Sequence, residues 1–451
     1  MENITIQDIL EATDGTLLCG DPSMKIDHLS TNSMEIGPNT LFVPIIGERV
    51  DAHIFIPNAL KEGGACLTQE HTEASGNAPY IKVPDTLTAM QQIAAYYRNK
   101  MSLPIIGVTG SVGKTTTREM IAHVLKGKYK VFETIGNQNS QVGVPLTLDH
   151  LTSEDEIGVL EMGMSEKGQI TTLGNIIHPN VGVSHIEMMG SRDNICIEKL
   201  DIQNGLPEDG VLFLNGDNDM IRKHIDYVKK PYEFYGFADD CTYRAEKIRE
   251  KGGQTLFEFH YGDMKEPITL NVLGKHNVSN ALSAIAVADL LGVPFTKIKE
   301  GLKSFHGTDR RFEYKGEVNG VTVIDDYAHH PTEINATLTA AKEYPHKEIW
   351  CIFQPHTYTR TKALFPEFVD ALTHADHVIL ADIYAARETD TLGMSSEMIA
   401  EELKKKGCDA YYFPSFEEIE NFCLDKCQKG DVLITMGAGN VVNIGENLLK
   451  R

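Results

Sequence analysis

Residues 105–117 read IIGVTGSVGKTTT and decide the fold of the middle of the chain. The apolar run 105–108 predicts a buried β-strand, and the glycine-rich turn 110–113 leads from it into a helix that begins at Lys114. Glycines let backbone N–H groups approach an anion, the helix N-terminus adds its positive end, and a lysine reaches the terminal phosphates. Val108 stands where the strict phosphate-loop pattern has its first glycine. The position after an apolar strand still favours a nucleotide site over an ordinary tight turn.

The size and charge of the chain limit the classes of protein to which it can belong. Its 451 residues are too many for one ordinary core, so we expect several domains. The formal net charge of −22 argues against a nucleic-acid surface, because phosphate backbones need clustered Lys and Arg. The segment MENITIQDIL is not typical of a signal peptide, and no apolar run has the length of a membrane span. We therefore expect a soluble, cytoplasmic monomer with no nucleic-acid partner and no membrane span.

Alternating strand-like and helix-like segments predict an α/β protein of three domains. The first domain covers residues 1–98, where short apolar runs alternate with helical segments. The second, residues 99–308, contains the phosphate-loop strand and further apolar runs typical of a parallel or mixed sheet. The third, residues 309–451, has four apolar runs that each lead into a polar loop. Because ligands of open α/β sheets bind beyond the carboxyl ends of the strands, these loops predict a second site.

Two polar residues follow apolar runs on the C-terminal side of the phosphate loop. Glu161 ends the run IGVLEMG, and His185 ends the run VGVSHI. Mg²⁺ held with a nucleotide prefers few carboxylates, phosphate oxygens and water, and the Thr115 hydroxyl after the lysine suits the same ion. One such residue at a strand end is usually a surface residue, but two at successive strand ends favour a metal site.

The sequence around these residues resembles the central domain of the Mur ligases, which build peptidoglycan precursors. The resemblance is carried by five stretches: TGSVGKTTT (109–117), TIGNQNSQVGVP (134–145), LEMGMSEKGQI (160–170), HIEMMGSRDNICIEK (185–199) and GKHNVSNALSAIAVA (274–288). It implies an α/β fold of three domains, with a central P-loop ATPase-like sheet and a C-terminal Rossmann-like sheet.

The two ends of the chain resemble different branches of this family. Residues 30–65 are similar to the uridine-binding domain of members that add D-alanyl-D-alanine, although Asn32-Ser33-Met34 replaces the usual Asp-Ser-Arg. The central domain is also closest to those members. The last third resembles members that add L-alanine or reattach a recycled tripeptide, through DRRFEYKG (309–316), DDYAHHPTEI (325–334), FQPHTYTRT (353–361), DIYAARE (382–388) and GDVLITMGAGN (430–440).

The family reaction transfers the γ-phosphate of ATP to a carboxylate, and an incoming amine then displaces phosphate from the acyl phosphate. The resemblance therefore implies ATP and Mg²⁺ as cofactors, and a UDP-muramyl-peptide and an amino acid or dipeptide as substrates. Because two of three domains agree, we expect addition of D-Ala-D-Ala to a UDP-N-acetylmuramoyl-tripeptide. The alternatives are addition of L-Ala or another amino acid or peptide to UDP-N-acetylmuramate, folylpolyglutamate synthesis, and a catalytically inactive nucleotide-binding relative.

The resemblance also assigns roles to individual residues. The expected ATP contacts are Gly110, Ser111, Gly113, Lys114, Thr115, Thr116, Asn277, Asn280, Arg311 and Asp326. The expected metal ligands are Thr115, Glu161, His185 and Lys199. The expected catalytic residues are Lys114, Lys199, His185 and Arg311. The expected substrate contacts are Ser33, Asn137, Asn139, Ser140, His329, His356 and Arg360.

Lys199 aligns with a lysine that several Mur ligases carbamylate. Carbamylation would replace a cation, with an ordinary pKa of about 10.4, by an oxygen ligand for a second Mg²⁺. The alternative is an ordinary helix lysine. In the last domain the Arg360 guanidinium suits a substrate carboxylate, and a neutral His329 or His356 suits the incoming amine. Thr357 stands where the L-alanine-adding members commonly have a second Arg, so the identity of the amine stays open.

Overall fold

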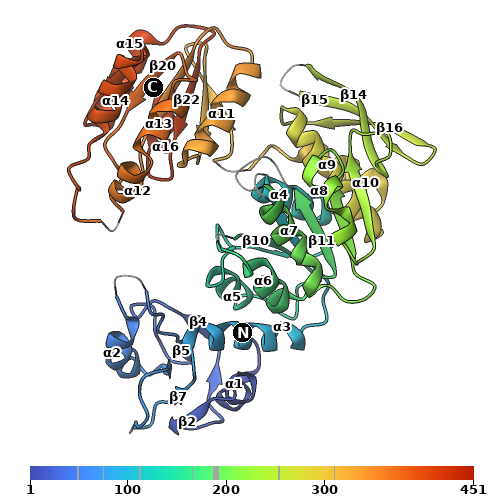
Figure 1. The fold of residues 1–451 in the computed structure, drawn as a ribbon, viewed down its shortest axis with the longest axis vertical. Coiled ribbons are helices and arrows are strands. Elements are labelled where there is room, and N and C mark those ends of the chain that lie inside the picture. Colours follow the sequence, from blue (N-terminus) through green and yellow to red (C-terminus); the bar gives the residue numbers. More distant parts are fainter. Residues whose placement is uncertain are drawn as a thin grey trace. The chain divides into compact units, whose positions relative to one another are not determined.

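The chain divides into two compact units, Met1–His306 and Gly307–Arg451, in the computed structural model (Figure 1). The structure describes all residues except 48–49, 75, 111–112, 165, 186–191, 252–253, 309 and 387. The side chains of His185, Arg192, Thr332 and Glu343 also lie outside the description.

The first unit begins with a five-stranded sheet whose strand order is β2-β7-β6-β5-β4. Its strands are β2 (Thr16–Cys19), β4 (His28–Ser30), β5 (Thr40–Phe42), β6 (Ala65–Thr68) and β7 (Tyr80–Lys82). The helices of this region are α1 (Ile6–Thr13), α2 (Ile56–Lys61) and α3 (Thr86–Lys100). Helix α3 starts where the Asp85 carboxylate accepts the backbone N–H of Thr88, as N-cap residues do. Its Ile93 and Tyr97 side chains belong to a core shared with the next sheet, so the two sheets form one unit.

The second sheet of this unit has nine strands in the order β16-β15-β14-β13-β12-β11-β8-β10-β9. The parallel strands are β8 (Ile105–Gly110), β9 (Val131–Glu133), β10 (Ile157–Met162), β11 (Val181–His185), β12 (Val211–Asn215) and β13 (Tyr232–Gly236). β14 (Tyr243–Lys251) pairs in parallel with β13, and an antiparallel extension then continues the sheet from β14 through β15 (Gln254–Tyr261) and β16 (Met264–Leu270). The parallel part is the expected phosphate-loop sheet, whereas the sequence patterns do not predict the extension.

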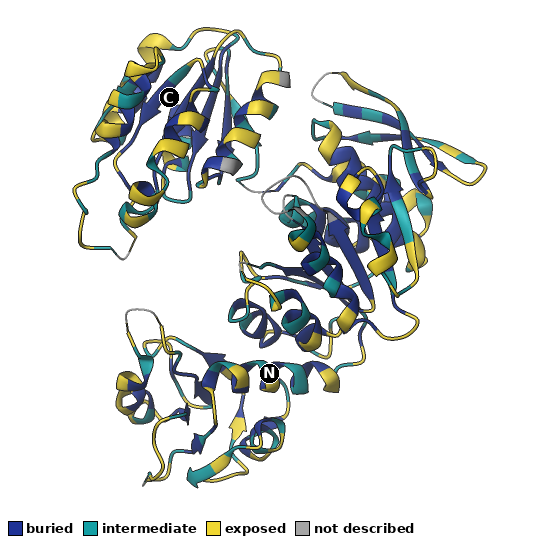
Figure 2. Ribbon diagram, viewed as in Figure 1, coloured by how far each residue is buried: buried dark blue, intermediate teal, exposed yellow. Residues whose placement is uncertain are grey.

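Helices cover both faces of the nine-stranded sheet. One core contains α4 (Lys114–Leu125), α9 (Lys275–Leu290) and α10 (Phe295–Ser304). The other face packs against α3, α5 (Gly143–Leu148), α6 (Gln169–Ile177) and α7 (Arg192–Leu200). Every residue of α9 from 277 to 288 is buried, as its dark ribbon in Figure 2 shows, because small side chains such as Ala281 and Ala284 allow close packing.

The C-terminal unit is a six-stranded sheet with the order β17-β18-β22-β19-β20-β21. Its strands are β17 (Glu313–Val318), β18 (Val321–Asp326), β19 (Ile349–Phe353), β20 (His377–Leu380), β21 (Asp409–Tyr412) and β22 (Val432–Met436). Only β17 runs antiparallel, so the sheet is Rossmann-like. Two cores, one on each face, join it to α11 (Pro331–Glu343), α13 (Phe365–Leu372), α14 (Ser396–Lys405), α15 (Phe416–Lys426) and α16 (Val442–Leu448). The short helix α12 (Tyr358–Ala363) precedes α13.

The predicted α/β class and its two characteristic sheets are confirmed. The boundary predicted near residue 98 falls inside α3, and the separation of uridine-binding from ATP-binding functions stays a prediction. Within the described residues, no helix combines the length and apolar character that crossing a bilayer requires.

Candidate functional site

The predicted phosphate loop lies between β8 and α4. Gly113 has a φ of 77°, a left-handed conformation that glycine adopts without steric cost, and it caps the helix that starts at Lys114. The backbone N–H groups of that helix start therefore face the loop, which suits an anion. Ser111 lies outside the described residues.

Strand register brings three predicted residues to one edge of the nine-stranded sheet. In the pairing with β10, Glu161 lies opposite Val108, and in the pairing with β11, His185 lies opposite Gly110. The carboxyl ends of β10, β8 and β11 are thus adjacent, with β8 in the middle. The position of the His185 backbone agrees with a role at the site, although its side chain lies outside the description.

The Glu161 carboxylate is the centre of this edge. Its side chain is buried, and the Thr115 hydroxyl donates to Oε2 over 3.0 Å. The Asn139 amide donates to Oε1 over 2.7 Å. A carboxylate and a hydroxyl beside a phosphate loop are hard oxygen donors of the kind that Mg²⁺ takes together with nucleotide phosphates. The residues present therefore fit that ion.

Lys199 reaches the same edge from α7. It is 5% exposed, and its Nζ donates to the backbone carbonyl of Gly110 over 2.7 Å. Burial, together with the nearby Lys114 charge, lowers the pKa of Lys199 to about 7. An amine with that pKa is largely neutral at slightly alkaline pH, which is the reactive form of a lysine.

The neighbouring Glu198 holds α7 in place. Its carboxylate accepts the backbone N–H groups of Gly168 over 2.7 Å and Ile170 over 3.2 Å, at the start of α6. The sequence analysis did not single out Glu198, although it precedes Lys199 directly. A buried acidic residue next to a candidate ligand is the signal that could have found it.

The two asparagines of the HNVSN segment connect α9 with α4. Asn280 accepts a hydrogen bond from the Thr117 hydroxyl over 2.9 Å, and its amide donates to Asn277 Oδ1 over 3.2 Å. Asn277 in turn donates to the Leu273 carbonyl over 2.7 Å. Both side chains are buried and paired within the unit, so the structure gives them a structural role besides the predicted adenine contact.

The predicted substrate contacts of the first unit do not form one cluster of side-chain bonds. Asn137 and Ser140 are exposed in the loop before α5, and the Ser140 hydroxyl accepts the Gly143 N–H over 3.1 Å. Ser33 is half-buried in the first sheet's region, where its carbonyl accepts from Asn58 over 3.3 Å. Their substrate roles stay predictions.

Asp326 ends β18 in the C-terminal unit and is almost fully buried. Its two carboxylate oxygens accept the backbone N–H groups of Phe312 over 2.7 Å and Ala328 over 2.8 Å. Burial raises the pKa of Asp326 to about 6, although these two bonds oppose the shift.

Of the two consecutive arginines of this unit, Arg310 binds the Asp325 carboxylate over 2.9 Å and two carbonyls of the 437–440 turn. Arg311, the predicted phosphate contact, lies near the Tyr327 ring.

His329, His356 and Arg360 come together in this unit. The two imidazole rings have centroids 6.2 Å apart, and Arg360 Nη1 donates to the His356 carbonyl over 3.1 Å. His329 Nδ1 donates to the Tyr327 carbonyl over 3.0 Å, which leaves its Nε2 as an acceptor. Burial lowers the pKa of both histidines, and the Arg360 charge adds to this for His356, so both are neutral near pH 7.

The His356 ring also has a neighbour from the motif DIYAARE to which the family resemblance assigns no role. Tyr384 stacks on it with centroids 5.5 Å apart. The buried Nδ1 of His356 has no hydrogen-bond partner among the described residues. A buried polar atom without a partner is costly, so this atom is suited to a substrate group.

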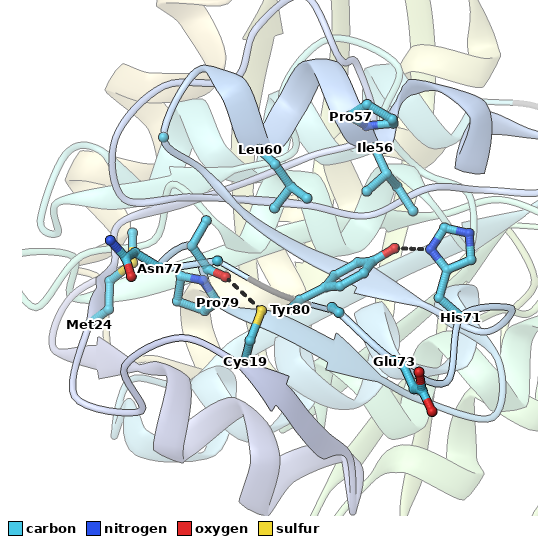
Figure 3. Close-up of a pocket in the computed structure, with 14 residues that line it drawn as sticks. Cys19, Met24, Ile56, Pro57, Leu60, His71, Glu73, Asn77, Pro79 and Tyr80 are labelled. Atoms are coloured by element: carbon cyan, nitrogen blue, oxygen red, sulfur yellow. Dashed lines mark hydrogen bonds between the residues drawn. The ribbon is translucent and has the colours of Figure 1, made fainter.

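A separate pocket of about 730 Å³ lies beside α2 and β7 of the first sheet (Figure 3). Ile56, Leu60 and Pro79 form part of its apolar wall, and the Tyr80 hydroxyl is hydrogen-bonded to His71. None of the predicted site residues lines it.

Comparison with known proteins finds relatives along most of the chain. The model of the Mur ligase middle domain matches residues 108–288, and that of the Mur ligase glutamate ligase domain matches residues 310–439. A UDP-N-acetylmuramate--L-alanine ligase of Agathobacter rectalis is 42% identical over 354 residues, 77% of this chain and 75% of the relative. One of Lachnospira eligens is 41% identical over 370 residues, 80% of this chain and 77% of the relative.

Solved structures show the same architecture. MurF from Acinetobacter baumannii superposes with a TM-score of 0.81 and 23% identity, covering 99% of both chains. The UDP-N-acetylmuramate-alanine ligase MurC from Thermotoga maritima superposes with a TM-score of 0.61 and 21% identity, covering 91% of this chain and 84% of the other. At such identities these likenesses speak for the fold alone.

Proposed function

The chain belongs to the Mur ligase family, and we propose that it joins the amine of L-alanine to the carboxylate of UDP-N-acetylmuramate. As a family member it is an ATP-dependent ligase of peptidoglycan synthesis. The observation that supports an active enzyme most strongly is the cluster of Thr115, Glu161 and Lys199 beside the phosphate loop. An inactive relative would have no need to keep a buried carboxylate and a buried lysine at this edge.

The first half of the reaction needs a phosphate to be held and its charge neutralised. Lys114 and the backbone N–H groups at the start of α4 would bind the terminal phosphates. Thr115 and Glu161 would hold Mg²⁺, which supplies positive charge to the phosphate oxygens. Transfer of the γ-phosphoryl group to the acceptor carboxylate then gives an acyl phosphate and ADP, and these residues act by position and charge.

Lys199 is proposed to be carbamylated. Its neutral amine, favoured by a pKa of about 7, can attack carbon dioxide and lose a proton to give an anionic carbamate. The carbamate oxygens would lie near Gly110, where they could steady a second Mg²⁺.

The second half needs an amine in its neutral form, held beside the acyl phosphate. In the C-terminal unit, Arg360 would bind the carboxylate of the amino acid, since a guanidinium fork matches a carboxylate. Nε2 of His329, the acceptor nitrogen of its neutral ring, and the unpartnered Nδ1 of His356 are suited to accept a proton from the amine. Attack of the amine nitrogen on the acyl carbon then expels phosphate and forms the amide.

The choice of L-alanine depends on sequence identity. The relatives at 41–42% identity are named for L-alanine and UDP-N-acetylmuramate, and they match about three quarters of the chain. The motifs of the first two domains predict D-Ala-D-Ala and a UDP-muramyl-tripeptide as substrates, and this stays the second candidate. It is favoured by the first 98 residues and by Thr357, which replaces an arginine that would narrow the pocket.

A phosphate-release assay that crosses two acceptors with two amines tests the proposal. UDP-N-acetylmuramate with L-Ala should release phosphate and give the amide by mass spectrometry, while UDP-muramyl-tripeptide with D-Ala-D-Ala should not. The reverse result would establish the second candidate. Phosphate release with neither pair, from protein that binds ATP, would contradict both.

A further inference from the structure

The Asn139 side chain is hydrogen-bonded to the Glu161 carboxylate of the proposed nucleotide site. We propose that Asn139 is a positioning residue, which fixes the orientation of the Glu161 carboxylate for Mg²⁺ and couples the loop 134–145 to the nucleotide site. This inference rests on the proposed function of the phosphate loop. It differs from the substrate contact that the sequence resemblance assigns to Asn139.

Two donors fix the Glu161 carboxylate, one on each oxygen. Asn139 Nδ2 lies 2.7 Å from Oε1, and Thr115 Oγ1 lies 3.0 Å from Oε2. Because the Glu161 side chain is 2% exposed, water does not replace a lost donor easily. Without Asn139, the carboxylate would be held at one oxygen and could rotate away from the geometry that a small, strict cation requires. Partners that orient a metal-binding carboxylate typically matter about tenfold to a hundredfold for metal affinity.

The loop that carries Asn139 is tied to β10 on both sides of Glu161. On the N-terminal side, the backbone N–H of Glu161 itself donates to the Thr134 hydroxyl over 2.8 Å. On the C-terminal side, the Gly163 N–H donates to the Asn139 carbonyl over 2.8 Å. The loop also contains Asn137 and Ser140, the predicted acceptor contacts. A shift of this loop on acceptor binding would therefore move the amide that holds Oε1.

Gly163 leaves the space that the Asn139 amide occupies. A Cβ atom at position 163 would lie 2.8 Å from Asn139 Oδ1 and 2.9 Å from its Cγ. The Gly163 backbone is outside the left-handed region, so an alanine there has no conformational penalty of its own. Gly163→Ala should thus push the amide off Glu161 without removing any polar group.

Calorimetric titration of Mn²⁺ into the full-length protein saturated with ADP tests the inference, with Mn²⁺ as the probe of the Mg²⁺ site. Asn139→Ala and Gly163→Ala should each weaken Mn²⁺ binding by about tenfold or more. Asn137→Ala, in the same loop, should leave Mn²⁺ affinity unchanged and raise only the KM for the acceptor. Asn204→Ala, an exposed asparagine that donates to Thr171, is the control for amide loss elsewhere in the unit.

The outcomes separate this inference from the proposed function. Absence of Mn²⁺ binding to the unchanged protein with ADP would contradict the nucleotide site itself. Normal Mn²⁺ binding by that protein and by both variants would overturn the positioning role. Loss in Asn139→Ala with normal affinity in Gly163→Ala would overturn it too, because the position of the amide would then not matter. Loss in both variants, with unchanged thermal unfolding, supports it.

Discussion

Two proposed sites lie at the carboxyl ends of parallel strands, one in each unit, yet their polar groups are arranged differently. The nucleotide end of the first unit contains Thr115, Glu161 and Lys199, and the proposed amine pocket of the C-terminal unit contains His329, His356 and Arg360. At the nucleotide end, Glu161 is hydrogen-bonded to Thr115 and Asn139, and Lys199 is hydrogen-bonded to Gly110. In the amine pocket, His356 keeps a buried ring nitrogen without a partner. The first arrangement is preorganised for charge that always arrives in the same form, as phosphate. The second leaves this ring nitrogen for a substrate group, which under the proposed function is the incoming amine.

Removal of the Lys114 amine, the proposed phosphate-binding cation, should have the largest effect at the nucleotide end. Lys114→Ala should lower ligation by about a thousandfold, because a preorganised charge in a closed site cannot be replaced by water. Thermal unfolding should change little, since the side chain acts on the nucleotide. The matched control is Lys126→Ala at the other end of α4, whose Nζ binds Glu133 at the surface. Comparable turnover in a folded Lys114→Ala variant would refute the assignment.

Lys199→Ala should cost nearly as much, about several hundredfold in rate. Short carboxylic acids should restore part of the activity if a carbamate is the missing group. Carbamylation needs the neutral amine, and the pKa of Lys199 is about 7. Incorporation of labelled carbon dioxide, at a fixed dissolved concentration, should therefore rise as pH increases through about 7 and fall below it. Mass spectra of active enzyme that show only unmodified lysine would contradict this prediction.

Arg360→Ala tests the proposed amine pocket. It should have a smaller effect, confined to kcat/KM for the amino acid. Loss of one charged hydrogen-bond partner costs a few kcal/mol, about a hundredfold in kcat/KM for the amino acid. ADP affinity, measured by calorimetry, should not change. Arg244→Ala, a half-buried arginine of the other unit that binds Glu246, provides the control. An equal loss of kcat/KM for ATP and for the amine would show that Arg360 is not specific to the pocket.

The smallest effect concerns an ion pair that belongs to neither site. His377 stacks on Trp350 with centroids 3.8 Å apart and is hydrogen-bonded to Glu348 over 2.7 Å and Asp409 over 2.6 Å. Burial alone would lower the pKa of His377, but these carboxylates raise it above its ordinary value. The stabilisation is complete below the unfolded pKa of about 6.5 and is lost as pH rises through the folded pKa.

His377→Gln should therefore lower Tm most at about pH 6 and least at pH 8.5. The free energy of unfolding that the substitution removes should differ between the two pH values by no more than about 1 kcal/mol, since the partners are exposed. Differential scanning calorimetry at the two pH values measures it. A Tm difference that grows with pH would have the wrong sign.

Local sequence patterns predict where the phosphate loop lies, but they do not predict the side-chain contacts around it. An apolar strand, a glycine turn and a helix start are consecutive in the sequence, so the phosphate loop could be recognised directly. The contact of Asn139 with Glu161 joins residues 22 apart and depends on how the loop follows β10. The sequence YRAEKIREK of β14 is highly charged and lacks a regular alternation of apolar and polar residues, so its pattern does not predict a strand of this sheet.

The C-terminal unit shows the same limit. The cluster of His329, His356 and Arg360 was predicted from motifs, but Arg310 and Arg311 are adjacent and identical in kind. Only the fold decides that Arg310 binds the Asp325 carboxylate, since both guanidinium groups lie near the Tyr327 ring. The choice between amines could not be settled either, because the first and last thirds of the sequence resemble different branches of the family.

One isotope experiment tests directly whether the chain activates an acceptor carboxylate as an acyl phosphate. The acceptor is UDP-N-acetylmuramate with both carboxylate oxygens replaced by ¹⁸O, incubated with ATP, Mg²⁺ and L-alanine. One carboxylate oxygen attacks the γ-phosphorus, and the later attack of the amine breaks the bond between the acyl carbon and that oxygen. Every phosphate released should then contain one ¹⁸O atom, seen as a shifted ³¹P resonance. Amide formation with unlabelled phosphate would contradict it.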